Sequence, residues 1–157
     1  MGRLTGSAAR EAYSYRADAA VPAFPDDKPI IVFDGKCVLC SRWARFVMRH
    51  DRDKRFRLLA AQTPLGAALY EHYGLDPVDY ETNVLLEDGR AFLKSEGTIR
   101  MFERLGFPWS LMTVFRVVPR ALRDKLYNVV ARNRLDWFGR CEICFVPEPG
   151  DADRFLG

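Results

Sequence analysis

The sequence predicts an α/β fold in which helices flank a mixed sheet, with an additional helical section towards the C-terminal end. Residues 29–33 form a short apolar, β-branched run, and the apolar spacing changes to a helical period over residues 38–49. Strand-like and helical segments then alternate before a hairpin at residues 83–93. Because parallel strands need helical crossovers and a hairpin is antiparallel, this order predicts a mixed sheet.

The first four elements have individual signals. The strand at 29–33 ends at an Asp-Gly turn, and the helix at 38–49 carries apolar residues on one side and arginines on the other. Residues 56–60 are expected to form the second strand. Residues 64–73 are expected to form a helix, because Pro64 suits a first turn and Gly74 suits a stop.

The remaining elements follow the hairpin. Residues 95–98 lead into a helix that Gly106 ends, and residues 107–134 are expected to form two further helices broken near Pro119. The whole order, from first strand to third helix, is a thioredoxin-like layout. The helices after Gly106 form its C-terminal extension.

The length and composition fit one folded unit. A chain of 157 residues that is 48% hydrophobic can bury one core of ordinary size. We expect residues 29–150 to form a single thioredoxin-like domain and residues 151–157 a tail. Residues 1–28 lack a sustained apolar period and are expected to form a loosely ordered arm. Aromatic side chains in this arm that can dock on the domain are Tyr13, Tyr15 and Phe24.

The charge is mildly basic and unevenly spread. A net charge of +3 without a run of like charges argues against nucleic acid as a partner. Residues 99–140 nevertheless hold nine basic and three acidic residues. A solvated helical face is the favoured interpretation, and an acidic partner or anionic headgroups are the alternative.

Residues 107–119 are too apolar for a free surface helix and too short to span a bilayer. Core packing beside the sheet is favoured. The alternative is an exposed docking surface of a peripheral binding module, flanked by arginines.

The location is expected to be cytoplasmic, because no segment has the length and apolar character of a membrane span or secretory signal. Thiols in that compartment are mostly reduced. Paired cysteines there indicate redox catalysis or metal binding more often than structural disulfides.

All four cysteines lie in two Cys-x-x-Cys pairs, Cys37 with Cys40 and Cys141 with Cys144. In a helix that begins at Cys37, unpaired amides and the helix dipole favour its thiolate, and Lys36 and Arg42 are expected to assist. Cys37 is therefore the predicted nucleophile. Cys40 is the predicted resolving thiol, in a more enclosed place one turn along the helix.

Asp34 lies three residues before Cys37 and has two equally favoured roles. Its carboxylate is placed to accept the proton that Cys40 must lose. It is also an ordinary Asp-Gly turn residue, whose oxygen accepts hydrogen bonds from loop amides.

Four thiolates also suit structural zinc, which is the alternative for Cys37, Cys40, Cys141 and Cys144. However, 100 residues lie between Cys40 and Cys141, against about 15–20 in common zinc motifs. The second pair is expected to be either a small buried pair or an accessory redox relay that reloads the first.

Several short motifs, taken together in their order and spacing, resemble the DCC family of thiol-disulfide oxidoreductases. The matching stretches are Phe33-Asp34-Gly35-x-Cys37-x-x-Cys40, Leu105-Gly106-x-Pro108-Trp109, Val118-Pro119-Arg120, Arg123-Asp124-x-x-Tyr127, Ala131-Arg132-Asn133-Arg134, Trp137-Phe138-Gly139-Arg140 and Cys144-x-x-Pro147.

The resemblance implies a thioredoxin-like fold and disulfide exchange, with Asp34, Cys37 and Cys40 as signature residues. It also implies a protein or small-molecule thiol or disulfide as partner, and no organic cofactor. Cys144 matches the family's late cysteine, whereas Cys141 is additional in this sequence.

Overall fold

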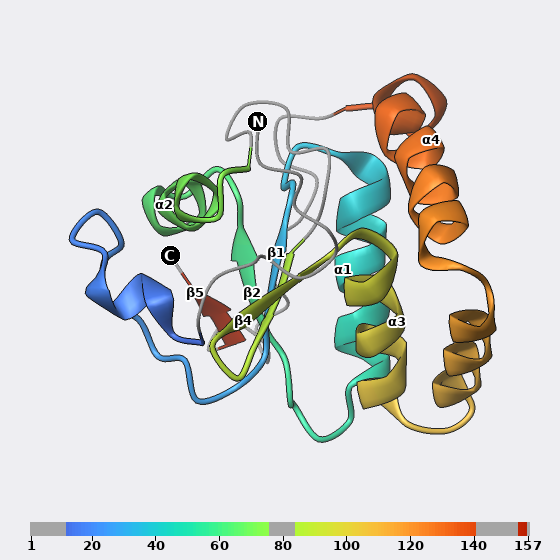
Figure 1. Cartoon of the computed structure of the whole chain (residues 1–157), viewed down its shortest axis with the longest axis horizontal. Helices are drawn as coiled ribbons and strands as arrows, with labels where there is room; N and C mark the ends of the chain where they lie inside the picture. Colours follow the sequence, from blue (N-terminus) through green and yellow to red (C-terminus); the bar gives the residue numbers. More distant parts are fainter. Residues whose placement is uncertain (1–11, 76–83, 141–153, 157) are drawn as a thin grey trace.

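The computed structural model describes residues 12–75, 84–140 and 154–156, and within them a five-stranded sheet lies between layers of helices (Figure 1). The strand order is β4-β3-β1-β2-β5. β1 runs parallel to β2 and antiparallel to β3, and β3 runs antiparallel to β4, so the predicted mixed sheet is confirmed. The strands are β1 (Ile30–Phe33), β2 (Arg57–Ala60), β3 (Val84–Glu87), β4 (Arg90–Leu93) and β5 (Phe155–Leu156).

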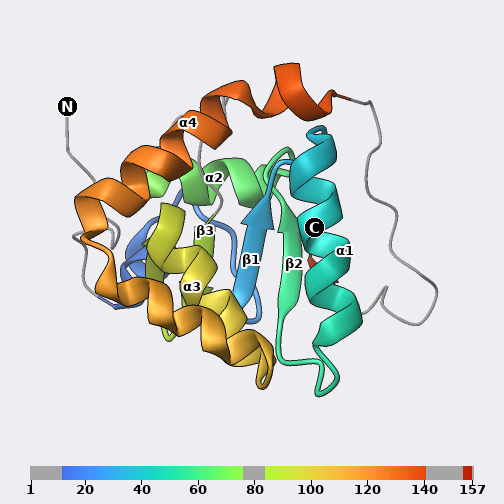
Figure 2. The ribbon, with the colours of Figure 1, turned by 90° about the vertical axis from the view of Figure 1, so that its right-hand side faces the viewer.

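The helices form layers on both sides of this sheet. Figures 1 and 2 show α1 and α3 against one face, α2 on the other, and α4 with its preceding 3-10 helix outside α1 and α3. The predicted break at Pro119 is confirmed, because Pro119 is the N-cap of α4. The helices are η1 (Ser14–Ala17), α1 (Val38–His50), α2 (Pro64–His72), α3 (Lys94–Leu105), η2 (Trp109–Val117) and α4 (Arg120–Phe138).

Strand β1 is the centre of the core, because its side chains are buried on both faces of the sheet. Ile30 and Val32 pack in the cluster on the α2 side, whereas Ile31 and Phe33 pack in the cluster beside α1 and α3. All four are at most 1% exposed. A continuous β-branched run suits such a doubly covered strand, which is why periodicity located it correctly.

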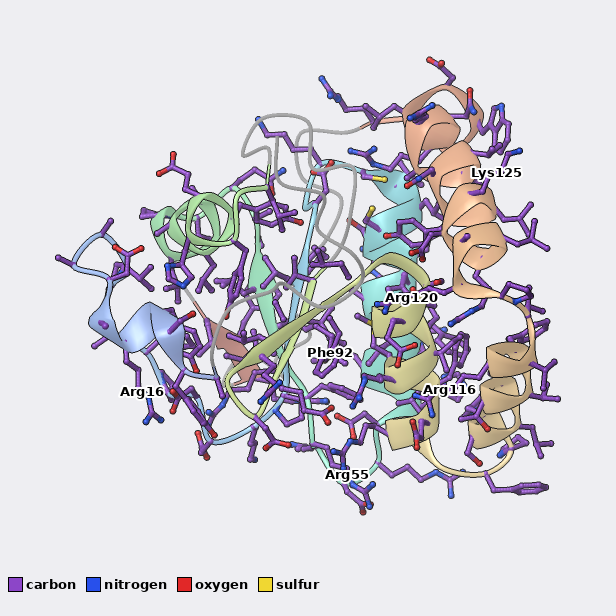
Figure 3. The ribbon with its side chains drawn as sticks, viewed as in Figure 1. Arg16, Arg55, Phe92, Arg116, Arg120 and Lys125 are labelled. Carbon is purple, nitrogen blue, oxygen red and sulfur yellow. The ribbon has the colours of Figure 1, made fainter. Side chains whose placement is uncertain are left out.

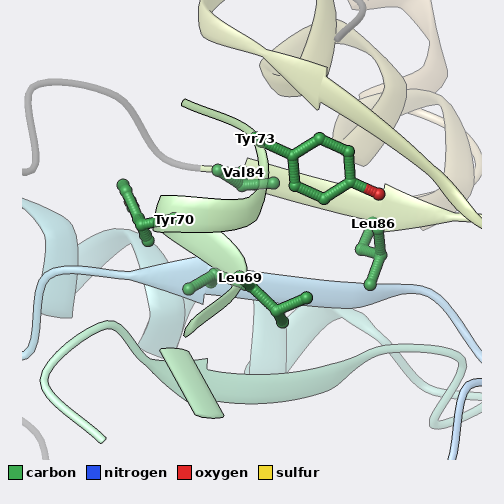
Figure 4. Close-up of a pocket in the computed structure, with 6 residues that line it drawn as sticks. Leu69, Tyr70, Tyr73, Val84 and Leu86 are labelled. Carbon is green, nitrogen blue, oxygen red and sulfur yellow. The ribbon is translucent and has the colours of Figure 1, made fainter. Parts of the chain in front are cut away.

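Helix α2 packs through apolar and tyrosine side chains. Figure 4 shows Leu69 and Tyr73 on the helix side and Val84 and Leu86 on β3 around one small apolar pocket. The residues that line the pocket carry no charge and no thiol. This face of the sheet therefore serves packing.

The N-terminal segment contacts the domain where it is described. Tyr15 is 2% exposed. Nδ1 of the buried His72 of α2 forms a hydrogen bond of 2.7 Å with Oδ2 of Asp18. Side chains of the described part of this segment thus dock on the domain, as was expected of its aromatic residues, and the loose order of residues 1–28 stays a prediction. Its aromatic side chains that join the core are Tyr13, Tyr15 and Phe24.

The C-terminal end also joins the domain where it is described. β5 pairs in parallel with β2, and the buried Arg154 forms an ion pair with the buried Asp51 and donates to the Phe56 carbonyl at 3.2 Å. The expected tail of residues 151–157 is therefore corrected for residues 154–156. A buried arginine needs such partners, and Asp51 provides the charge.

Residues 107–119 do not pack in the core, so that prediction is wrong. Phe107 is 81% exposed and Val117 is 82% exposed, and helix η2 contains no buried residue. The reason is topological, because α1, α2 and α3 already cover the sheet and η2 passes outside α3 (Figure 2). Among the described residues, no helix combines the length and apolar content that crossing a bilayer requires.

Candidate active site

The first cysteine lies at the start of α1, as predicted. Cys37 is the N-cap, with an extended backbone (φ −97°, ψ 124°), and its Sγ accepts a hydrogen bond from the Cys40 amide at 3.4 Å. The cap suits this position, because the first amides of a helix have no partner within the helix. The end of β1 and the Asp34-Gly35 turn bring the sulfur to these amides.

The two thiols differ in acidity. A hydrogen bond from the Cys40 thiol is the main cause that lowers the pKa of Cys37 to about 6, and the Cys40 amide and Arg134 lower it further against the effect of burial. The same hydrogen bond and burial raise the pKa of Cys40. The favoured state is a Cys37 thiolate beside a protonated Cys40.

Asp34 is buried beside the cysteines and is fully engaged. Its Oδ1 accepts hydrogen bonds from the Lys36 amide at 2.9 Å and from Gln62 Nε2 at 2.5 Å. Its Oδ2 lies 3.4 Å from Nη2 of Arg134, and both side chains are 5% exposed. The role of Asp34 as an acceptor for loop amides is confirmed, whereas its role as proton acceptor for Cys40 stays a prediction.

Arg134 is one of two residues of the site that the sequence did not reveal. It comes from α4, 100 positions after Asp34, and contributes to the lowered pKa of Cys37. Lys36 and Arg42, which were expected to assist, are both exposed. A signal for Arg134 exists in the Ala131-Arg132-Asn133-Arg134 motif, but nothing local separates one arginine of α4 from another.

Gln62 was also missed, although its position was predictable. It follows β2 as Asp34 follows β1, and these neighbouring strands are parallel. Carboxyl ends of parallel neighbours meet at one edge of a sheet, so polar residues after them lie close together. Gln62 accepts from the Gly35 amide at 2.9 Å, and thereby holds the turn before Cys37.

The exposure of the two cysteines is the reverse of the prediction. Cys37 is 0% exposed and Cys40 is partly exposed, and the described residues that lie over Cys37 are Gly139 and Arg140. Cys37 pairs with Arg140 in an isolated antiparallel bridge, and the Val38 amide donates to the Gly139 carbonyl at 3.3 Å. Gly139 has a φ of 95°, which glycine adopts without strain as the chain turns out of α4.

Alkylation by iodoacetamide should reveal the lowered pKa. In a Cys141→Ser/Cys144→Ser variant, the alkylation rate of Cys37 is expected to rise with pH and level off above a midpoint near 6. At pH 7 about 90% of Cys37 would be thiolate, against about 3% for a free cysteine of pKa about 8.5. Mass spectrometry of peptides gives the rate at each pH. In a variant that also carries Cys37→Ser, the rise of the alkylation rate with a midpoint near 6 should be absent. A midpoint near 8.5 in the parent would contradict a lowered pKa of Cys37.

The second pair, Cys141 and Cys144, lies outside the described residues. Within the described ranges, no group of three or more His, Cys, Asp or Glu side chains could hold a metal ion. Cys37 and Cys40 supply two ligands, and a structural zinc site takes four. The zinc alternative and the accessory relay both stay predictions.

Comparison with known proteins adds to this geometry. The sequence model of the DCC1-like thiol-disulfide oxidoreductase family matches residues 31–140, which include Asp34, both cysteines of the first pair and Arg134. The chain belongs to that family. The resemblance drawn from its motifs is therefore confirmed, as is the thioredoxin-like fold class.

Two relatives show the same similarity along most of the chain. The uncharacterized protein YuxK of Bacillus subtilis (strain 168) is 35% identical over 127 residues, covering 81% of this chain and 93% of its own. A DCC family protein of Arabidopsis thaliana, named as chloroplastic, is 37% identical over 120 residues, covering 76% of this chain and 70% of its own. No solved structure matches the chain significantly.

Proposed function

We propose that the chain exchanges electrons with a partner disulfide or dithiol through Cys37 and Cys40. The observation that carries the proposal is the position of the Cys37 sulfur at the N-cap of α1, where it accepts a hydrogen bond from the Cys40 amide at 3.4 Å. Thiolate is the attacking form in disulfide exchange, and this arrangement favours thiolate at one sulfur only. The family is one of thiol-disulfide oxidoreductases, which supports the same role.

The exchange balances without any further reagent. The Cys37 thiolate attacks one sulfur of a partner disulfide, the partner's S–S bond breaks, and a mixed disulfide and one partner thiolate result. Cys40 then loses its proton, to Asp34 in our proposal, and attacks Cys37 Sγ. The partner leaves reduced by two electrons, its two thiolates take up protons from solvent, and Cys37 and Cys40 remain as a disulfide.

The lowered pKa of Cys37 favours one direction. Stabilising the thiolate stabilises the reduced pair, and a disulfide whose reduced form is stabilised is a stronger oxidant. We therefore propose that the Cys37–Cys40 disulfide oxidises partner dithiols more readily than the dithiol reduces partner disulfides. The same bonds form and break in reverse order.

The partner is proposed to be a protein or small-molecule thiol or disulfide, since exchange between sulfur atoms needs no organic cofactor. Access to Cys37 requires that Gly139 and Arg140 move aside, because their backbone covers it. The cytoplasmic location and the lack of a nucleic-acid partner stay predictions, as do accessory roles for Cys141 and Cys144.

Trapping the mixed disulfide tests the proposal. A Cys40→Ser variant in a Cys141→Ser/Cys144→Ser background, treated with oxidised glutathione, should keep one glutathione on Cys37. The parent with Cys40 should release it and form an internal disulfide within the same time. Intact mass and peptide mapping distinguish the two products. If Cys40→Ser carries no adduct on Cys37 although the parent forms its disulfide, Cys37 is not the attacking thiol.

A further inference from the structure

The large apolar side chains that face solvent are gathered in one region. All eleven of them in the described part of the chain lie between residues 107 and 138. Figures 1 and 2 show that η2 and α4, which hold most of them, form the outermost layer of the molecule. We call this set the outer face: Phe107, Leu111, Val114, Phe115, Val117, Leu122, Leu126, Val129, Val130, Trp137 and Phe138.

The side of α4 that faces the protein carries charged and polar groups beside the buried Ala131. Arg134 forms an ion pair with Asp34, and it is 4% exposed. Near the other end of the helix, Arg123 lies 3.5 Å from Glu96 of α3, and Asp124 accepts from Ser95 Oγ. Charged and polar groups thus join this helix to the domain.

The opposite side of α4 is apolar. Leu122, Leu126 and Val129 follow one another at spacings of four and three residues, which place them on one face of a helix. They are 48%, 59% and 46% exposed. A surface helix ordinarily buries its larger apolar side chains, whereas α4 leaves these three exposed to solvent. A patch of this kind marks an interaction surface.

Cations accompany the outer face. Lys125 and Arg132 are exposed on α4, and Figure 3 shows Lys125 on its outer side. Of the two acidic residues of α4, Asp124 is turned towards Ser95 and only Asp136 is exposed. The charge beside the exposed apolar side chains is therefore net positive.

We propose that the outer face docks on an anionic lipid surface. The apolar side chains would enter the boundary between headgroups and acyl chains, and Lys125 and Arg132 would meet the headgroup charge. Symmetric pairing of two copies through this face would bring Lys125 and Arg132 of both chains together, which like charges oppose. Charge complementarity therefore favours an anionic surface over a second copy.

Docking would also place the cysteine pair close to the lipid. Helix α4 ends at Phe138, and the next two residues, Gly139 and Arg140, cover Cys37. This inference rests on the proposed function. The position of the cysteine pair near the lipid assigns thiols of membrane-attached proteins as the partner class. Lipid binding itself needs neither cysteine, so its test is independent of exchange activity.

Sedimentation with vesicles tests the docking. The full chain should bind vesicles of phosphatidylcholine with 30% phosphatidylglycerol at low salt, bind pure phosphatidylcholine at least about tenfold more weakly, and weaken further in 0.5 M salt. Leu122→Ser/Leu126→Ser should weaken binding by about tenfold or more. These side chains are exposed, so near-UV circular dichroism and the thermal midpoint should stay unchanged.

A charge-matched pair of variants separates local from general attraction. Lys125→Glu/Arg132→Glu should weaken binding far more than Arg49→Glu/Arg90→Glu, which changes the net charge equally at exposed positions of α1 and β4. Equal losses would overturn the proposal. No binding to the anionic vesicles would overturn it too, and a dimer that Leu122→Ser/Leu126→Ser dissociates would assign the outer face to a second copy instead. If the chain stays monomeric and does not bind the anionic vesicles, the proposal is wrong and the outer face is assigned to a protein partner instead.

Discussion

Replacing Cys37 with serine is expected to abolish disulfide exchange, down to the rate of the uncatalysed reaction. A serine hydroxyl is not ionised near neutral pH and does not attack disulfide sulfur, and Cys40 alone cannot close a disulfide with it. The substitution removes the hydrogen bond to Cys37 that is the main cause of the raised pKa of Cys40, but burial, which also raises this pKa, remains and favours the thiol. The helix should persist, because serine is a preferred N-cap and its oxygen can accept from the Cys40 amide. Oxidation of a reduced model peptide, followed by mass spectrometry, measures the loss.

The control for Cys37→Ser is Cys141→Ser/Cys144→Ser, which keeps the first pair and should retain most exchange. Full exchange by Cys37→Ser, with loss in Cys40→Ser, would make the partly exposed Cys40 the attacking thiol. Loss of activity in both Cys37→Ser and the control would instead make the second pair necessary.

Replacing Arg134 with methionine is expected to cost about 3–5 kcal/mol of folding free energy, since it leaves Asp34 ionised and unpaired in a buried place. The pKa of Cys37 should rise at the same time, because Arg134 lowers it and Asp34, which remains, raises it. The midpoint of Cys37 alkylation should therefore move up from about 6. Urea unfolding measures the first effect and the alkylation profile measures the second.

A double variant distinguishes the ion pair from general packing. Arg134→Met/Asp34→Asn removes both charges and should recover most of the lost stability, since the amide oxygen of the substituted side chain could still accept from the Lys36 amide. If the double variant is no more stable than Arg134→Met, the lost ion pair is not the cause. An alkylation midpoint unchanged by Arg134→Met would show that the cation does not act on Cys37.

The fold was predictable where local signals and short-range geometry agree. The β-branched run of β1, the cysteine at the start of α1 and the hairpin of β3 and β4 are each recognisable within a few residues. Residues 107–119 were predicted wrongly because an apolar composition indicates that a segment needs a covering, and it does not indicate whether the protein itself provides one. Here the sheet was already covered.

The residues of the site also differ in whether a local pattern reveals them. Asp34, Cys37 and Cys40 were predictable, because one turn and one helix start hold them together. Arg134 was not, since an ion pair between positions 100 residues apart leaves no local pattern. No local pattern reveals that Gly139 and Arg140 cover Cys37 either. For that reason Cys37 was predicted to be more exposed than Cys40, whereas it is less exposed.

By itself the sequence determined the mixed sheet, the helix that begins at the first cysteine, and the membership of a thiol-disulfide oxidoreductase family, because period, caps and motif order are properties of neighbouring residues. Only the tertiary structure decided which cation lies beside the thiolate, which cysteine is covered, and which side of α4 is left apolar towards solvent. Those outcomes depend on how distant segments pack, and packing energy is shared among many contacts rather than held by any one of them.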